Sequence, residues 1–166
     1  MLRKLRIYLD TSVINFLFAE DAPEERDITR EFLDERLVRH DVYISDTVLV
    51  EIANTRDPAK RGLLQEAVSH YALRSVDPHP DDQGRIMALA TEYIKRRVVP
   101  ASQWEDALHV AMATVLGFDI LLSWNFRHMA NVERQKKINR VNHDCGYEKQ
   151  LLLVTPMEVL NEGENE

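Results

Sequence analysis

The sequence predicts an α/β domain of three layers, with a central parallel sheet of about five strands between two layers of helices. Two patterns carry this prediction. Short apolar runs alternate with longer helical patterns along the chain, which indicates crossover units and a parallel sheet covered on both faces. The runs are also apolar at consecutive positions, as expected of strands buried on both sides.

In chain order, strands are expected at residues 7–9, 42–44, 72–76, 120–122 and 151–154, of which 72–76 is the weakest signal. The segments between them are helical in pattern. One helix is expected at about residues 80–97, because its apolar residues recur every three or four positions and so form one face. Those residues are Ile86, Leu89, Ala90, Tyr93 and Ile94.

Two helix starts match the capping box, in which a Ser or Thr and a Glu three residues later satisfy backbone amides of the first turn. The first is Ser102 with Glu105. The second is Thr155 with Glu158, and a proline at the first helical position adds to its signal. The helix after Ser102 is expected to end at Gly117.

The chain of 166 residues has the size of one domain, which we place at residues 1–160, followed by an acidic frayed tail at 161–166. With 45% apolar and 30% charged residues, it has the composition of an ordinary globular protein. No apolar stretch approaches the length of a membrane-spanning helix. The single cysteine fits a reducing compartment, so we expect a cytoplasmic protein with no membrane partner.

The formal net charge of −7 argues against a protein that coats nucleic acid non-specifically, because phosphate binding depends on clustered Lys and Arg. It does not exclude a nucleic-acid substrate. Carboxylates that hold metal ions form a locally cationic site once loaded, and basic clusters remain at residues 95–97 and 134–137.

Three acidic residues stand where chemistry is expected. Asp10 closes the first strand, and ligands of parallel sheets bind beyond the carboxyl ends of the strands. Glu51 borders the apolar face of a helix, and Asp106 follows the capping Glu105 near a helix start. Each acid also has a purely structural explanation. Asp10 could cap the next helix, Glu51 could be a solvent-exposed residue beside the apolar face, and Asp106 could stabilise the positive end of the helix dipole. Asp46, by contrast, is assigned to a helix cap.

Convergence of these three acids would favour a divalent-metal site. Carboxylates about 4 Å apart repel by roughly 4 kcal/mol per pair at an effective dielectric constant of 20, so such a cluster is tolerated only with cations present. Oxygen ligands alone suit Mg²⁺ or Mn²⁺. Sequence spacing by itself leaves the convergence as an expectation.

The same residues resemble the PIN domain nucleases, and among them the VapC-type toxins of toxin-antitoxin pairs. The likeness covers nearly the whole chain and rests on residues 9–12, Glu51, residues 104–109 and residues 121–125. Further residues look like one branch of that family, namely residues 123–128, Asn139, Asn142, residues 146–147 and residues 155–159.

The resemblance implies a central parallel sheet with acids at its carboxyl edge, and cleavage of RNA that depends on Mg²⁺ or Mn²⁺. Carried over residue by residue, Asp10, Glu51 and Asp106 match the metal-binding acids. Asn125 departs from the pattern, because many members place a further Asp there, and an amide brings no charge to a second ion. The expected partners are an RNA substrate, a small antitoxin protein and a second copy of the chain in a homodimer.

Asn125 is therefore expected to take part in catalysis and, with Ser12, Ser123 and His128, in substrate binding. Ser123 and Asn125 would hydrogen-bond to the phosphate or to a metal-bound water. His128 is a candidate proton donor, although a lone His after a strand is more often a packing or capping residue.

Two other classes of function stay open. A catalytically impaired PIN-fold module that binds RNA or protein is motivated by Asn125. An aspartyl phosphotransferase is disfavoured, because such enzymes usually need a second Asp where Ser12 stands. Trp104 and Trp124 could stack on RNA bases, although a Trp beside an apolar helix face more often belongs to the core or to an interface. Val13, Phe16 and Leu17 are expected to form an exposed face for a small partner protein, and the alternative is that they belong to the core.

Overall fold

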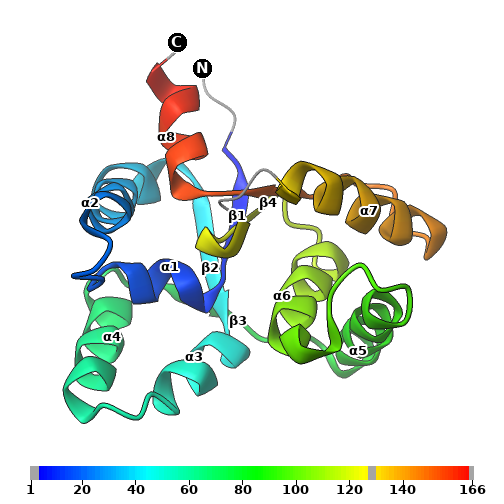
Figure 1. The fold of residues 1–166 in the computed structure, drawn as a ribbon, viewed down its shortest axis with the longest axis horizontal. Coiled ribbons are helices and arrows are strands. Elements are labelled where there is room, and N and C mark those ends of the chain that lie inside the picture. The colour runs from blue at the N-terminus through cyan, green and yellow to red at the C-terminus, as the bar shows by residue number, and fades with distance from the viewer. Residues whose placement is uncertain (1–3, 127–129, 165–166) are drawn as a thin grey trace.

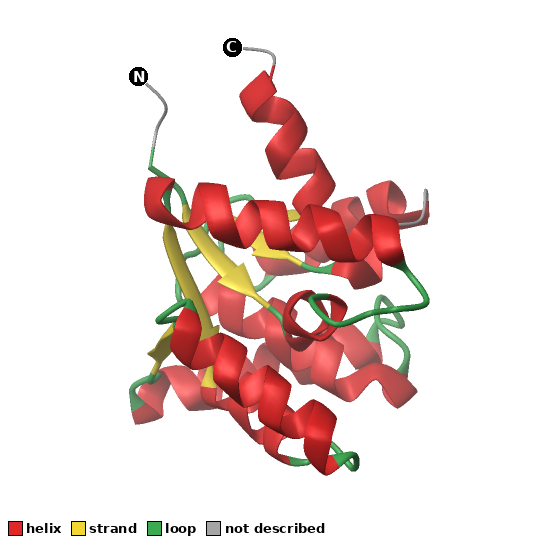
Figure 2. Ribbon diagram, turned by 90° about the vertical axis from the view of Figure 1, so that its left-hand side faces the viewer, coloured by secondary structure: helices red, strands yellow, loops and turns green. Residues whose placement is uncertain are grey.

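The computed structural model describes residues 4–126 and 130–164 and contains a five-stranded parallel sheet between helices (Figures 1 and 2). The strands are β1 (Arg6–Leu9), β2 (Asp41–Ser45), β3 (Arg74–Val76), β4 (Ile120–Leu122) and β5 (Leu152–Val154). They lie in the order β3-β2-β1-β4-β5, and each neighbouring pair is parallel. The predicted three-layer α/β fold is confirmed, and all five predicted strands are found within two residues of the expected ends.

The helices carry the labels of Figure 1. They are α1 (Thr11–Phe16), α2 (Pro23–Glu31), α3 (Asp46–Ala53), α4 (Pro58–His70), α5 (Pro80–Lys95), α6 (Trp104–Val115), α7 (Ala130–Asp144) and α8 (Pro156–Glu164). A π-helical turn lies at Phe32–Arg36, and 3₁₀ turns lie at Leu37–Arg39, Ala101–Gln103 and Trp124–Phe126. Helix α8 continues to Glu164 and so includes the first four residues after position 160. None of the helices in the described residues is both long enough and apolar enough to cross a bilayer.

The central strand β1 divides the core into two parts, which explains why it is apolar throughout. Ile7 and Leu9 face a cluster formed with α1, α3, α4 and α8, whereas Tyr8 faces a second cluster formed with α5, α6 and α7. Figure 1 shows these two groups of helices on opposite sides of the sheet. Because side chains alternate along a strand, a sheet covered on both faces needs apolar residues at every position.

The predicted cap at Ser102 is wrong. Helix α6 begins at Trp104 after the 3₁₀ turn Ala101–Gln103, and its N-cap is Gln103, without a capping side chain. The Gln103 N–H already bonds to the carbonyl of Pro100 at 2.9 Å. Ser102 therefore lies inside a turn, whereas a capping Ser needs an extended backbone just before the helix.

The predicted cap at Asp46 is also wrong, because Ser45 takes that position. The Ser45 backbone is extended, and its Oγ accepts a hydrogen bond from the Val48 N–H at 3.4 Å. One of the two hydrogen bonds of the second capping box is confirmed, because Glu158 Oε2 accepts from the Thr155 N–H at 2.9 Å. Gly117 follows α6 with a φ of +74°, a left-handed conformation that ends helices and favours glycine.

The expected antitoxin face on α1 is wrong as an exposed surface. Val13 and Leu17 are buried in the core, and the half-buried Phe16 stacks on Trp124 with ring centroids 5.5 Å apart. Trp124 is 2% exposed, and its Nε1 donates to Thr29 Oγ1 at 2.7 Å, so it is not available to stack on RNA in this structure. Trp104 is half-buried against the second core cluster.

Candidate active site

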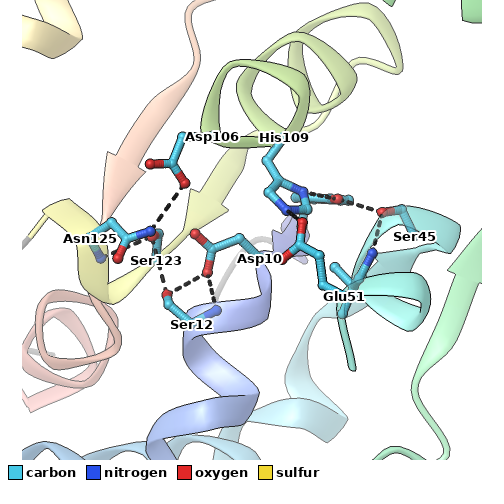
Figure 3. A network of polar contacts seen from close by, with 10 residues as sticks. Asp10, Ser12, Ser45, Glu51, Asp106, His109, Ser123 and Asn125 are labelled. Atoms are coloured by element: carbon cyan, nitrogen blue, oxygen red, sulfur yellow. Dashed lines mark hydrogen bonds and ion pairs between the residues drawn. The ribbon is translucent and has the colours of Figure 1, made fainter. Parts of the chain in front are cut away.

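Acidic and amide side chains lie at the carboxyl edge of the sheet, where β1, β2 and β4 end (Figure 3). Asp10 directly follows β1, and Asn125 lies in the turn that follows β4. Glu51 reaches the edge from α3, which begins directly after β2, and Asp106 reaches it from the first turn of α6. Because β2 and β4 are the two neighbours of β1, parallel pairing brings their carboxyl ends together.

Asp10 is both a helix cap and a buried carboxylate. Its Oδ1 accepts hydrogen bonds from the Ser12 N–H at 3.0 Å and from the Ser12 hydroxyl at 2.5 Å, which caps α1. The side chain is only 3% exposed. Burial raises the pKa of the Asp10 carboxyl above its ordinary value, although the charge of His109 and the bond from Ser12 oppose the rise. The capping role thus coexists with a carboxylate withdrawn from water.

Asp106 and Asn125 meet across the edge. The Asn125 Nδ2 donates to Asp106 Oδ1 at 3.2 Å. Burial raises the pKa of Asp106 as well, and His109 and this amide bond work against that rise. In Figure 3 the side chains of Asp10, Asp106 and Asn125 point toward the same space.

Two serines fix the local backbone of this edge. The Ser12 Oγ accepts from the Trp124 N–H at 2.9 Å and lies 3.3 Å from the Ser123 Oγ. The Ser123 Oγ in turn accepts from the Asn125 N–H at 3.0 Å, and Ser123 is fully buried. Ser123 is thus placed to orient Asn125 through the backbone N–H of that residue. His128, the fourth predicted substrate-binding residue, lies outside the described residues.

His109, on α6, also lies at this edge, although the sequence did not predict it as a site residue. His109 is 3% exposed on α6, and its Nε2 lies 2.9 Å from Glu51 Oε1. Its Nδ1 lies 2.6 Å from the Tyr8 hydroxyl. The sequence held one signal, because a His three residues after Asp106 shares its helical face and stands among apolar neighbours.

The protonation of Glu51 and His109 is coupled. Burial opposes ionisation of Glu51, but the hydrogen bond and charge of His109 outweigh it and hold the pKa of Glu51 below its ordinary value. Burial also opposes the charged imidazole, but the bond to Glu51 and the charges of Asp10, Glu51 and Asp106 raise the pKa of His109. An ionised Glu51 beside a protonated His109 is therefore favoured.

The donors at this edge fit a hard divalent cation in chemistry, because they are carboxylate and amide oxygens. The expected close convergence of three acids is not found: within residues 4–126 and 130–164, no group of three His, Cys, Asp or Glu side chains is arranged to hold a metal ion. Asp10 and Asp106 alone can suit Mg²⁺, which usually keeps several waters and takes one or two carboxylates.

Comparisons with known proteins agree with the fold. A sequence model of the PIN domain family matches residues 7–134. Among solved structures, the chain is similar to one in the crystal structure of VapBC2 from Rickettsia felis bound to a DNA fragment from their promoter. The TM-score is 0.60 at 16% sequence identity, and the alignment covers 91% of this chain and 98% of that chain. No curated protein matches the chain in sequence.

Proposed function

The chain belongs to the PIN domain family, and on that premise we propose that it is a VapC-type endoribonuclease that hydrolyses RNA with the help of Mg²⁺ or Mn²⁺. The observation that carries the proposal is the buried Asp10 carboxylate, which lies at the carboxyl edge near Asp106 and is deprived of solvent. A divalent cation between these carboxylates would offset both the desolvation and the mutual repulsion.

In this proposal Asp10 and Asp106 hold the ion, and Glu51 is the third acid of the site. A divalent ion held by these residues would supply a water of lowered pKa and would stabilise charge on the phosphate. Ser12 keeps Asp10 in one orientation through two hydrogen bonds to Oδ1. These contacts orient the Asp10 carboxylate before the cation and substrate bind, which lowers the cost of organising the site.

Asn125 would bind substrate through its amide. The NH₂ group has two hydrogens, of which one points to Asp106 Oδ1, so the second can donate to a phosphate oxygen. Ser123 sets the direction of this amide through the Asn125 N–H. Ser12 and His128 remain the other candidates for contact with the RNA.

We further propose that the chain is the toxin of a toxin-antitoxin pair. The structural neighbour is VapBC2 on a DNA fragment from their promoter, and this supports a small antitoxin as the partner of this chain. A homodimer and a cytoplasmic location belong to the same proposal. If co-expression with the adjacent small reading frame gives neither a complex nor relief of growth inhibition, the toxin role fails while the nuclease role can stand.

Asp10→Asn provides the sharpest test of the nuclease. Asn caps a helix about as well as Asp, so the fold is retained while the negative charge is removed. The purified protein should cleave single-stranded or structured RNA in Mn²⁺ or Mg²⁺, and EDTA should stop it. Asp10→Asn and Asp106→Asn should lower kcat/KM by about two orders of magnitude or more, since each 1.36 kcal/mol of lost stabilisation is tenfold in rate.

Glu105→Gln is the matched control, because it removes an exposed carboxylate one residue before Asp106. Its cleavage rate should equal that of the wild type. Cleavage that persists in excess EDTA would contradict the metal dependence, and an Asp10→Asn variant with full activity would contradict the assignment of the site.

A second candidate function is an impaired module that binds RNA or protein without cutting. The observation that favours it is Asn125, whose amide stands where many family members place an Asp and whose NH₂ group already bonds to Asp106. RNA binding without cleavage at every Mn²⁺ concentration would support this module and exclude the nuclease.

A further inference from the structure

A buried chain of hydrogen bonds runs from Glu51 into the core. Glu51 Oε1 lies 2.9 Å from His109 Nε2, the Tyr8 hydroxyl lies 2.6 Å from His109 Nδ1, and Ser45 Oγ lies 2.6 Å from the Tyr8 hydroxyl. Tyr8, Ser45 and His109 are buried, whereas Glu51 is half-exposed at the edge of the sheet. This series of hydrogen bonds thus ends at Glu51, whereas Asp10 is fixed by Ser12 and Asp106 accepts a hydrogen bond from Asn125.

The two hydroxyls allow this chain to stay complete in either protonation state of the imidazole, because each can donate or accept. With a neutral imidazole, Tyr8 donates to His109 Nδ1 and Ser45 donates to Tyr8. With a charged imidazole, Nδ1–H donates to Tyr8 and Tyr8 donates to Ser45. An ionised Glu51 has no hydrogen to give, so in both arrangements His109 Nε2–H donates to Glu51.

The residues of this hydrogen-bond series lie on the same strands and helices that carry the acids. Tyr8 lies on β1, two residues before Asp10, and its ring packs against Phe118 at 5.6 Å. Ser45 ends β2 and caps α3, the helix that carries Glu51. His109 lies on α6, one turn after Asp106. A displacement of the imidazole would therefore move Glu51 relative to both other carboxylates.

We propose that His109 is a positioning residue, which holds the Glu51 carboxylate in place at the carboxyl edge of the sheet, and that Tyr8 and Ser45 hold His109 as a permanent donor to Glu51. The inference rests on the proposed function, since it gives Glu51 its orientation toward the divalent cation. A carboxylate fixed in this way needs no reorganisation when the ion binds, and groups that orient metal ligands typically affect affinity by about 10–100-fold.

Two substitutions of His109 separate its two contacts. The carboxamide of Gln reaches about as far as Nε2, so His109→Gln can still donate to Glu51. The carboxamide of Asn reaches only about as far as Nδ1, so His109→Asn keeps the Tyr8 contact and loses the Glu51 contact. Mn²⁺ affinity is measured by electron paramagnetic resonance of the free ion, together with thermal melting and RNA cleavage.

We expect His109→Asn to weaken Mn²⁺ binding by about 10–100-fold and His109→Gln to restore most of that loss. Tyr8→Phe removes the hydroxyl that fixes the imidazole, and it should weaken Mn²⁺ binding as well. Its matched control is Tyr93→Phe, which removes a buried hydroxyl bonded to Asn142 in the second core cluster, away from the acids. That control should lower the melting temperature and leave Mn²⁺ affinity unchanged.

The outcomes distinguish the inference from the function on which it rests. A wild type that neither binds Mn²⁺ nor cleaves RNA overturns the proposed function and the inference with it. A wild type that does both, with folded His109→Asn and Tyr8→Phe variants that bind Mn²⁺ equally well, overturns the inference alone. If His109→Asn, His109→Gln and Tyr93→Phe all weaken Mn²⁺ binding equally, His109 has a purely structural role and the inference is overturned.

Discussion

Asn125 is the residue at which the two candidate functions separate, because its amide faces Asp106 at 3.2 Å. Asn125→Asp replaces that hydrogen bond, worth about 1.5–3 kcal/mol for a charged acceptor, with repulsion between two carboxylates. If the amide also donates to the phosphate, cleavage should fall by about tenfold or more at every metal concentration. The measurement is the cleavage rate of both proteins over a titration of Mn²⁺.

The opposite result for Asn125→Asp is equally informative. If Asn125 merely replaces a metal ligand, the added charge tightens a second ion and raises activity most at low Mn²⁺. A variant at least as active as the wild type at every concentration would therefore defeat the role of Asn125 as a phosphate donor.

Asp10 and Asp106 also set a pH dependence of stability in the metal-free protein. Burial raises the pKa of both carboxyls above the ordinary 3.8, so the folded state holds their protons more tightly than the unfolded state. Their contribution is complete below that value and is lost as pH rises through the raised pKa. With EDTA present, the melting temperature of the wild type should therefore fall more than that of Asp10→Asn as pH rises from about 4 to about 8.

Asp41→Asn is the control for this pH series. Hydrogen bonds and charges from Lys4 and Arg74 hold the pKa of Asp41 below 3.8, so its contribution is lost only as pH falls through that lower value. Over this pH series, the melting temperatures of the wild type and Asp41→Asn should change in parallel. If, from about pH 4 to about pH 8, the melting temperature of the wild type also changes in parallel with that of Asp10→Asn, this would contradict a raised pKa for Asp10.

The sequence predicted the position of the acids at the sheet edge but not the identity of their neighbours. Asp10 was placed at the edge because a strand end is a local pattern, and Asn125 was singled out because it departs from a family pattern. His109 was missed because its partners, Glu51 and Tyr8, lie 58 and 101 residues away along the chain. Only the fold, which packs α6 against one face of β1 and α3 in the cluster on the other face, brings these groups within hydrogen-bond distance at the shared carboxyl edge.

At the scale of whole elements, helix α7 covers β5, the strand at one edge of the sheet. Strand β5 has β4 on one side only, and side chains of α7 bond to the backbone beside it. Asn139 Oδ1 accepts from the Leu151 N–H, its Nδ2 donates to the Leu151 carbonyl, and Gln135 Oε1 accepts from the Leu153 N–H, all at 2.8–2.9 Å. Such cover prevents an open strand edge from pairing with another chain.

Asn139→Ala should destabilise the fold without touching the acids. It leaves the buried N–H and carbonyl of Leu151 without these partners, at about 1–3 kcal/mol for an unsatisfied group, and each kcal/mol lowers the melting temperature by roughly 2–4 °C at this chain length. Lys136→Ala, on an exposed position of the same helix, should not change the melting temperature. Equal melting temperatures for the two variants would contradict the role of Asn139 at the strand edge.

Strands were easier to predict than helix starts for a physical reason. A strand buried on both faces is apolar at each position, and this signal is in the sequence itself, as at Ile120–Leu122. A cap depends on the backbone conformation before the helix, which the residue type alone does not fix. Ser102 has the right side chain but lies in a turn, whereas Ser45 has the extended backbone that Asp46 lacks.

At the scale of the whole molecule, the site joins the two halves of the core. Helix α3 packs in the cluster on one face of the sheet, and α6 packs in the cluster on the other. The acids Glu51 and Asp106 therefore approach Asp10 from opposite layers, with β1 between them. A cation held at this edge is linked to the folded arrangement of both layers, and it has no matching site in the unfolded chain.

Mg²⁺ should therefore stabilise the fold, and more strongly at high pH than at low pH. A ligand at about 100 times its Kd adds roughly 2.7 kcal/mol, which corresponds to a rise in melting temperature of roughly 5–10 °C for a chain of this length. Protons compete with the cation for Asp10 and Asp106, because the pKa of both carboxyls is raised, so the rise should shrink as pH falls toward those values. Thermal melts of the wild type and Asp10→Asn with and without Mg²⁺ measure this effect. Asp10→Asn should show little rise at any pH, and an equal rise in both proteins would mean that Mg²⁺ binds elsewhere on the chain.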